Sequence, residues 1–330
     1  MTAQPKTNDD LMKEIETHLK DYVVPEPKPI IGAETIQLIV MREILDYTVL
    51  RTEETRELNT VVTPTSVTKH DDLTRVAFLA SKQKAAESRE LEKMLRSAVN
   101  AVDSQSGYDE GNPKPAECFL KDNLCLSCPR CGLFGGTSTE SGKGNTPNIK
   151  HRIEYSTAFS LLSFGEVESS FTFNAIADDK QITGRALGTR YTVLPAKLFP
   201  SVITLRGVTK EEFVLVVKTL LATKSYGAET RIGGDVRNHI LGIACGWEEA
   251  ITALELTLEL YDIKGDITTD TVTPILTKYK EYAGNKNKVL VLGNATVENL
   301  IDTASSIDLD KDFLKTTYGH IAKYRKIQTS

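Results

Sequence analysis

Apolar residues recur at the spacing of an α-helix in several stretches of the chain. The clearest is residues 82–102, where Leu91, Leu95 and Val102 belong to one apolar stripe among polar neighbours. Thr209 precedes Glu212 by three residues, a capping box that predicts a helix start at residue 210. The predicted helices are one around Leu11, Ile15 and Leu19, then residues 82–102, 210–222, 272–283 and 308–326.

A long run of apolar and β-branched residues, 34–51, predicts the first strand. On it Gln37, Arg42 and Arg51 have the spacing of exposed positions. The following sequence RTEETRELNTVVTPTS predicts a polar loop or hairpin that leads away from this strand.

Further strands are predicted after residue 150. Aromatic and β-branched residues alternate with polar ones between residues 151 and 207, and turn signals at Asp178, Asp179 and Gly184 indicate antiparallel strands that include a long hairpin. The segment NKVLVLG predicts a short strand. Leucines alternate with polar residues in TALELTLELYD, at positions Leu254, Leu256, Leu258 and Leu260, which favours a strand with one wet face, although Leu and Glu also suit helices.

The order strand, helix, strands, helix, strand is that of a ferredoxin-like core, so the fold class is α+β. Two helices are expected on one face of an antiparallel sheet, and the other face is expected to stay free for a ligand. The predicted division is residues 1–33 as an N-terminal segment and linker ending in PEPKP, 34–106 and 150–260 as the core with hairpin insertions, 107–149 as an insertion, and 261–330 as a mainly helical part.

Composition and charge narrow the class of protein. The 330 residues carry a net charge of −5, and no apolar run approaches the ~20 residues of a membrane span. The acidic N-terminus lacks the core of a signal peptide, so we expect a cytoplasmic protein without a membrane partner. Residues 143–237 hold 13 Lys and Arg against 9 Asp and Glu, whereas residues 246–310 hold 5 against 12. The middle therefore attracts polyanions, unless this small bias is solvated surface charge alone.

Four of the five cysteines, Cys118, Cys125, Cys128 and Cys131, lie within fourteen residues of one another. Thiolates at this spacing favour a closed four-cysteine zinc site that supports folding and has no open position for a substrate. An iron-sulfur cluster is an alternative, although the fourth cysteine of the ferredoxin motif is missing. Two more interpretations stay open, namely reduced or disulfide-bonded cysteines and a site with His151 as a fourth ligand.

Two glycine-rich segments suggest ligand-binding loops. GGTSTESGKGN departs from a phosphate-binding loop, because five residues separate Gly136 from Gly142 and Gly144 occupies the hydroxyl position, so nucleotide hydrolysis is excluded. SYGAETRIGGDVRN combines backbone that a ligand can approach with arginines that can grip phosphates and with Tyr226, which could stack on a base. This favours single-stranded RNA as the ligand, although a plain surface turn would also use glycines.

These features resemble the backbone subunit of the type I-D CRISPR effector (Cascade) complex, in the RAMP superfamily. CLSCPRCGLFG, HRIEYSTAFS and KSYGAETRIGG carry the resemblance, which covers about residues 30–325. It implies a modified ferredoxin-like (RRM-like) core with a zinc-binding insertion and a thumb-like β-hairpin. It also implies that copies line up along CRISPR RNA, together with other subunits, and present it for pairing with target DNA. The predicted RNA-binding residues are Arg42, Arg51, Lys143, Lys150, His151, Arg152, Arg185, Arg190, Lys224, Tyr226, Gly227, Arg231 and Arg237.

The resemblance also bears on catalysis. Relatives in type III systems cut RNA with an aspartate in the loop after the first strand, where this chain has Glu53, Glu54 and Glu57 but no aspartate. The aromatic motifs of an ordinary RRM are not visible either, so we expect RNA to be held through its backbone and not cut. The alternative is a metal-dependent ribonuclease that uses the metal insertion and these glutamates.

Overall fold

The computed structural model describes residues 6–52, 57–103, 118, 124–137, 148–177, 182–227 and 234–329, without the side chains of residues 173–177, 182–187 and 329. Its centre is a five-stranded sheet in the order β12-β11-β1-β10-β6, and each neighbouring pair is antiparallel. The strands are β1 (Thr35–Ile44), β6 (Ile153–Tyr155), β10 (Leu198–Arg206), β11 (Val236–Gly246) and β12 (Leu290–Val291). Together with the helices below, this confirms the α+β class.

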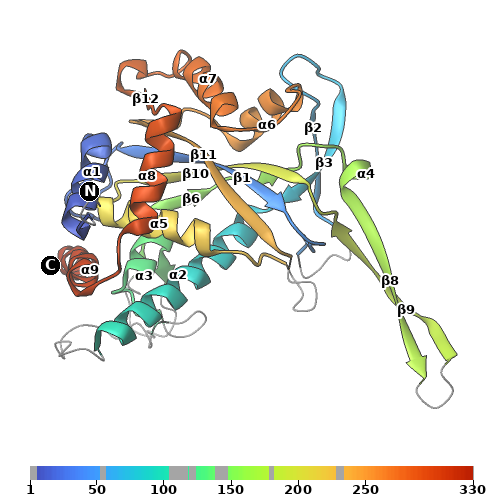
Figure 1. Cartoon of the computed structure of the whole chain (residues 1–330), viewed down its shortest axis with the longest axis horizontal. Helices are drawn as coiled ribbons and strands as arrows, with labels where there is room; N and C mark the ends of the chain where they lie inside the picture. The colour runs from blue at the N-terminus through green and yellow to red at the C-terminus, as the bar shows by residue number, and fades with distance from the viewer. Residues whose placement is uncertain are drawn as a thin grey trace, which may run out of the picture.

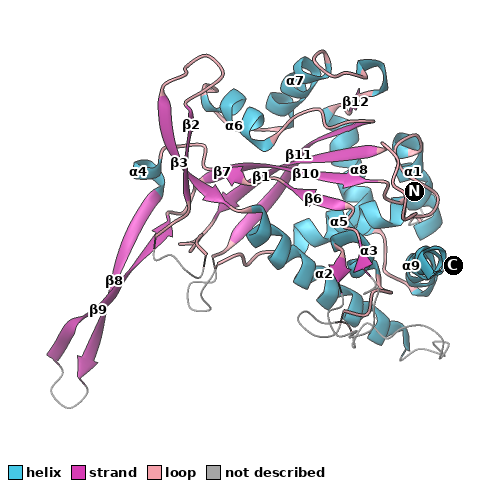
Figure 2. Ribbon diagram, turned by 180° about the vertical axis from the view of Figure 1, so that it is seen from behind, coloured by secondary structure: helices cyan, strands magenta, loops and turns pink. Residues whose placement is uncertain are grey.

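One face of the sheet packs on two long helices, α2 (Ala80–Asp103) and α5 (Lys210–Ala222) (Figures 1 and 2). The main hydrophobic cluster joins Leu38 and Val40 of β1 to Leu91 of α2 and Val217 of α5. Both helices agree with the predicted ranges within two residues. The capping box is also confirmed, because the Thr209 hydroxyl accepts a hydrogen bond from the Glu212 backbone N–H.

The other face is covered, so the prediction of a free face is wrong. Helices α6 (Ala253–Tyr261) and α7 (Thr269–Lys280) lie over it (Figure 1), and Leu256 and Leu276 pack there on Ile39 in a second hydrophobic cluster. The end of this face near Arg237 and His239 keeps partly exposed charged side chains.

The predicted strand at Leu254–Leu260 is wrong, because it is helix α6. A capping box between Thr252 and Glu255 starts the helix, and the leucines four residues apart, Leu256 and Leu260, share its buried side. Alternating Leu and Glu fits both periods, and here the cap signal decides between them.

Two hairpins extend from the body. Strands β8 (Glu168–Ala177) and β9 (Ile182–Val193) pair along their length and project away from the body (Figure 1). They are the predicted long hairpin. A shorter sheet contains β2 (Thr60–Pro64), β3 (Asp72–Phe78) and β7 (Ala158–Phe159), and Arg75 holds it by donating to the carbonyls of Thr65, Ser160 and Leu161. Helix α4 (Phe164–Val167) precedes the long hairpin.

The terminal helices complete the main cluster. The helix predicted around Leu11 is α1 (Asn8–Leu19), and it packs on α5 and α8 (Asn294–Ser306), a helix that the sequence analysis missed. The predicted C-terminal helix is α9 (Lys311–Thr329). Short elements are α3 (Pro129–Phe134), β4 (Gly136–Thr137), β5 (Asn148–Ile149) and the 3-10 turn η2 (Lys286–Lys288). In the part of the chain that the structure describes, every helix is too short or too polar to span a membrane.

Candidate nucleic-acid interface and cysteine cluster

The four clustered cysteines converge as a metal site requires. Their sulfur atoms all lie within 4.8 Å of one another, with 3.5 Å between the Sγ atoms of Cys118 and Cys131 and 3.7 Å between those of Cys118 and Cys128. Tetrahedral zinc with Zn–S bonds of about 2.3 Å needs sulfurs about 3.8 Å apart. The donor set and its spacing therefore fit a closed four-thiolate site.

Backbone groups support the same arrangement. The N–H groups of Cys125, Ser127 and Cys131 point at the sulfurs of Cys118, Cys125 and Cys128 at 3.4–3.5 Å. Such N–H groups stabilise negative charge on thiolates. Cys128 is also the N-cap of α3, with Pro129 at the first helical position, so one residue both caps the helix and offers a ligand.

The cysteine cluster is built into the body of the protein. Cys118, Cys128 and Cys131 belong to the main hydrophobic cluster, and the buried Arg130 donates from Nε to the Ser88 hydroxyl on α2 at 2.8 Å. Arg96, also on α2, donates to the Cys118 carbonyl. A metal held here would therefore fasten α3 to α2.

Three residues predicted to touch RNA are buried instead. The first is Arg42, which is predicted on the exposed side of its strand but is 0% exposed. Its Nη1 donates to Tyr226 Oη at 3.0 Å and Asn238 Oδ1 at 2.9 Å, and lies 2.7 Å from Glu87 Oε1. Because both faces of the sheet are covered, a polar residue at alternating spacing on β1 points into the protein. Gln37 is buried for the same reason.

Tyr226 is the second, and it cannot stack on a base in this conformation. The ring is 2% exposed and packs edge-on against Phe78, and its hydroxyl donates to Glu87 Oε1 at 2.7 Å. Burial, followed by the charge of Glu87, raises the pKa of Tyr226 well above its ordinary value. Tyr226 therefore anchors the start of the glycine-rich loop to the buried core through its ring and hydroxyl.

Arg152 is the third. It is 0% exposed, and its guanidinium forms a bidentate ion pair with the Glu212 carboxylate. Nη2 contacts Oε1, and Nη1 donates to Oε2 at 2.6 Å. The same guanidinium donates to the carbonyls of Gly132 and Gly207. Arg152 thus joins the cysteine segment to the start of α5 and is not available to phosphate.

The remaining predicted residues divide into three groups. Lys150, His151, Lys224 and Arg237 are exposed, and Arg51, Arg190 and Gly227 are partly exposed. Burial, followed by the charge of Lys84, lowers the pKa of His151, so it is neutral at pH 7. The glutamate in the loop after β1 that the structure describes, Glu57, is also exposed. Lys143, Arg231, Glu53, Glu54 and the Arg185 side chain lie outside the described part of the chain.

The glycines at the two ends of the loop meet closely. Gly234 has a φ of +62°, and a Cβ there would lie 2.9 Å from the Gly227 Cα and 2.7 Å from the Thr48 Cγ2. Ser225 and Asp235 pair as an isolated bridge, and Thr48 pairs with Val193 at the base of the long hairpin. The loop ends, the segment after β1 and the hairpin base therefore come together. Sequence reasoning missed Glu87 and Asn238, which hold this junction but lie in separate, unremarkable segments.

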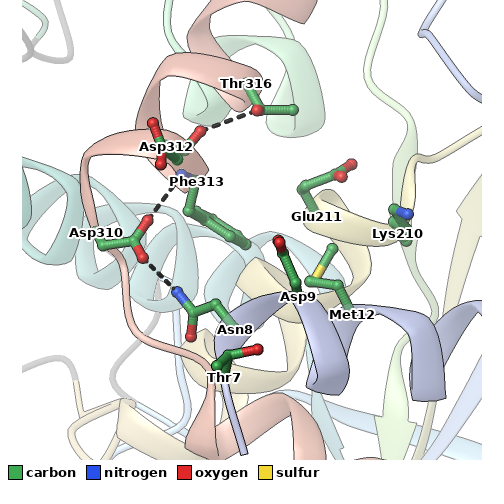
Figure 3. Close-up of a pocket in the computed structure, with 10 residues that line it drawn as sticks. All are labelled: Thr7, Asn8, Asp9, Met12, Lys210, Glu211, Asp310, Asp312, Phe313 and Thr316. Carbon is green, nitrogen blue, oxygen red and sulfur yellow. Dashed lines mark hydrogen bonds between the residues drawn. The ribbon is translucent and has the colours of Figure 1, made fainter.

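A hollow of about 360 Å³ lies elsewhere, where α1, α5 and α9 begin (Figure 3). Carboxylates of Asp9, Glu211, Asp310 and Asp312 line it together with Lys210. Asp310 accepts from the Asn8 side chain at 2.6 Å and from the Phe313 backbone N–H at 2.9 Å, so it serves as a helix cap (Figure 3). The acidic lining of the hollow would repel phosphate, so we do not assign nucleic-acid binding to this hollow.

Comparison with known proteins agrees with this architecture. A family model described as "Csc2 Crispr" matches residues 22–327, which is nearly the whole chain. The chain belongs to the Csc2 family. No curated protein matches it. The crystal structure of Thermofilum pendens Csc2 is similar with a TM-score of 0.64 and 19% identity, over 96% of this chain and 98% of that one, which shows a shared fold.

Two further structures are more distant. A "CRISPR RNA-guided surveillance complex" chain has a TM-score of 0.42 at 11% identity, over 74% of this chain and 83% of that chain. A "CRISPR RNA-guided surveillance complex, pre-nicking" chain has 0.49 at 11% identity, over 82% and 100%. Membership of the Csc2 family confirms the CRISPR assignment that the cysteine and glycine motifs indicated.

Proposed function

We propose that this Csc2-family protein is a non-catalytic backbone subunit of a type I-D CRISPR effector complex. In this proposal copies of the chain line up along CRISPR RNA, hold its phosphate backbone, contact other subunits and present the guide for pairing with target DNA. The observation that carries the proposal is the junction of glycine-rich loop ends and hairpin base, with exposed Lys224 and Arg237 beside it. The partly exposed backbone of Gly227 next to these cations suits single-stranded RNA held without base reading.

The sheet supports a ferredoxin-like core. Strands β11, β1, β10 and β6 are adjacent in that order, and α2 and α5 connect them along the chain on one face. In chain order the four core strands are β1, β6, β10 and β11. The fourth, β11, lies beside the first, β1, and the third, β10, lies between β1 and the second, β6, which is the strand order of a ferredoxin-like core. The converging thiols likewise support a zinc-binding insertion.

The ribonuclease alternative has less support. Within the described ranges the cysteine cluster is the group of side chains that could hold a metal, and a closed thiolate site leaves no position for an attacking water. Incubating the purified protein with labelled RNA and Mg²⁺ or Mn²⁺ separates the two functions. Cleavage products that disappear in a Glu57→Gln variant would favour the nuclease.

We expect RNA binding to be sensitive to salt and tolerant of sequence. Each phosphate neutralised on a single strand adds about 0.7 to the slope of log affinity against log salt concentration. Arg237→Ala and Lys224→Ala should each flatten that slope by about this amount, measured by fluorescence anisotropy with labelled oligouridine. Both side chains are exposed, so neither change should unfold the protein.

The matched control is Lys288→Ala, because Lys288 is exposed in the net-negative later part of the chain and lies over the Trp247 ring. Its salt slope should equal that of the wild type. Wild-type slopes in both the Lys224 and Arg237 variants would exclude this junction as the RNA site. Arg231→Ala, outside the described ranges, would test the rest of the glycine-rich loop in the same assay.

A further inference from the structure

Two large aromatic side chains are exposed where β11 and α7 end. Trp247, which follows β11, is 45% exposed, and Tyr282, which follows α7, is 71% exposed. In the described ranges every other exposed large hydrophobic side chain is aliphatic. Glu248 joins the two segments, because its carboxylate accepts from the backbone N–H of Gly284 at 3.0 Å and from that of Asn285. Tryptophan and tyrosine are enriched where proteins bind other proteins.

A hollow of about 400 Å³, here called the tyrosine hollow, lies beside Tyr282. Tyr279 and Tyr282 both line it, with ring centres 5.8 Å apart and ring planes at 88° to each other. Three carboxylates line the same hollow, those of Glu248, Glu249 and Glu255. The described residues that line it include no Lys or Arg, whereas the acidic hollow at α1 includes Lys210. The tyrosine hollow therefore combines aromatic rings with negative charge.

Two of these carboxylates are held in place without a cation. The two backbone N–H groups that bind Glu248 also lower the pKa of its carboxyl group, so it stays ionised at pH 7. Glu255 accepts from the backbone N–H and the hydroxyl of Thr252 at 2.9 and 2.7 Å, in the capping box of α6. Within the described ranges neither carboxylate forms an ion pair, whereas Glu249 pairs with Arg206. The hollow therefore offers fixed negative charge to a cation from outside the chain.

The segment between β11 and α6, which lines the hollow, is anchored to the sheet. Gln37 of the central strand β1 is 1% exposed, and its Oε1 accepts from the backbone N–H groups of Ala250 at 2.7 Å and Ile251 at 3.2 Å. Its Nε2 donates to the Ile251 carbonyl at 3.0 Å. The buried glutamine thus fixes the position of the hollow before a ligand binds, and such preorganisation lowers the entropy cost of binding.

An arginine side chain has the chemistry that this hollow recognises, since a planar guanidinium stacks on aromatic rings and donates in pairs to carboxylates. Two neighbouring rings already bind cations of the chain itself. Lys288 Nζ lies 4.7 Å from the centre of the Trp247 ring, and Lys278 Nζ lies 5.7 Å from that of Tyr279. The exposed ring of Tyr282 is accessible to a cation from another molecule.

The charge of the chain indicates which molecule brings the cation. The 330 residues carry a net charge of −5, so a second copy is repelled as a whole, and a basic partner is attracted. Trp247 lies outside the lining of the hollow but next to Glu248 in sequence, so the aromatic surface extends past the hollow itself. A protein segment covers such a surface, whereas a free small cation fills the hollow alone.

We propose that the tyrosine hollow, between the start of α6 and the end of α7, docks a basic segment of another protein through an arginine side chain bound by Tyr282, Glu248 and Glu255. This site goes beyond the proposed function and does not depend on it. Helices α6 and α7 lie on the opposite side of the sheet from α2 (Figure 1). Arg237 and Trp247 are ten residues apart along β11, or about 33 Å, so a partner here leaves the RNA junction free.

Trp247 is the single tryptophan of the chain, so tryptophan fluorescence of the full chain reports on this surface alone. The probe is a peptide of four Gly-Arg repeats, and its twin carries neutral citrulline in place of each arginine. The arginine peptide should change the emission of the wild-type protein to saturation, and the citrulline peptide should not. Tyr282→Ser should weaken binding by about fivefold, because the ring contact with the cation is lost. Glu255→Gln should weaken it by about threefold and keep the capping box, which accepts Gln.

The matched control is Asp9→Asn, which removes the same charge from the acidic hollow at α1 and should bind the peptide as the wild type does. All three variants should melt at the wild-type temperature. An unchanged Trp247 emission, equal binding of the citrulline peptide, or wild-type affinity in both Tyr282→Ser and Glu255→Gln overturns the inference. If Asp9→Asn weakens binding as much as Glu255→Gln, the peptide responds to overall acidity and the site is likewise overturned. RNA binding at the junction is measured separately, so the proposed function survives each of these results.

Discussion

Arg152→Ala should lower the free energy of unfolding by about 3–5 kcal/mol, because it leaves Glu212 charged, buried and without its partner. Glu212 is 1% exposed, so water cannot replace the lost guanidinium, and the carbonyls of Gly132 and Gly207 lose their donor as well. Urea denaturation monitored by circular dichroism measures the change. The slope of RNA binding against salt should not change in the fraction that stays folded, since Arg152 reaches no solvent.

A matched control is Arg206→Ala. Arg206 pairs with Glu154 and Glu249, but all three side chains are about one-third exposed, so the loss should be at most about 1 kcal/mol. The double variant Arg152→Leu/Glu212→Leu should recover part of the stability, because it removes both buried charges. If Arg152→Ala is as stable as Arg206→Ala but flattens the salt slope, the residue contacts RNA after all and the buried pair is not its role.

The second large effect concerns the metal. The purified protein should contain about one zinc per chain, and Cys128→Ser should lose most of it. Structural zinc sites bind with an apparent free energy of roughly 10–16 kcal/mol, and that energy is coupled to folding. Because Cys128 also caps α3 inside the main cluster, we expect a lower melting temperature and lower solubility in addition to metal loss. Metal analysis and thermal denaturation measure the two effects.

Cys245→Ser is the matched control, since Cys245 is equally buried in the main hydrophobic cluster but lies on β11, outside the group of four cysteines. Its zinc content should equal that of the wild type. Full zinc in Cys128→Ser would remove Cys128 from the ligand set. If the metal analysis finds iron and the protein absorbs in the visible range, the site holds an iron-sulfur cluster and not zinc.

Local signals in the sequence predicted the parts of this fold that local chemistry determines. The cap of α5 at Thr209, the apolar stripe of α2 and the cysteine spacing each depend on a few neighbouring residues. For that reason the predicted convergence of the four cysteines agrees with the structure. The turn between Cys125 and Cys128, in which Leu126 has a φ of 52°, is determined by its own short loop.

The errors come from contacts between distant segments. Arg42 is predicted to be exposed if its strand has one open face, but Glu87, Tyr226 and Asn238 reach it from three other segments. Arg152 meets Glu212 sixty residues later for the same reason. The local sequence around a buried arginine resembles that around a surface arginine, so only their tertiary partners distinguish the two.

The position of β1 in the sheet has a consequence for synthesis of the protein. Glu43 pairs with Leu198 and Arg237, so the first strand of the sheet meets its neighbours only after more than 150 further residues are made. At about 5–20 residues per second, the apolar segment TIQLIVMREI waits on the order of 10 s or longer at the ribosome. During that interval it is an unpaired, aggregation-prone strand, and the yield of folded protein should depend on chaperones that bind nascent chains.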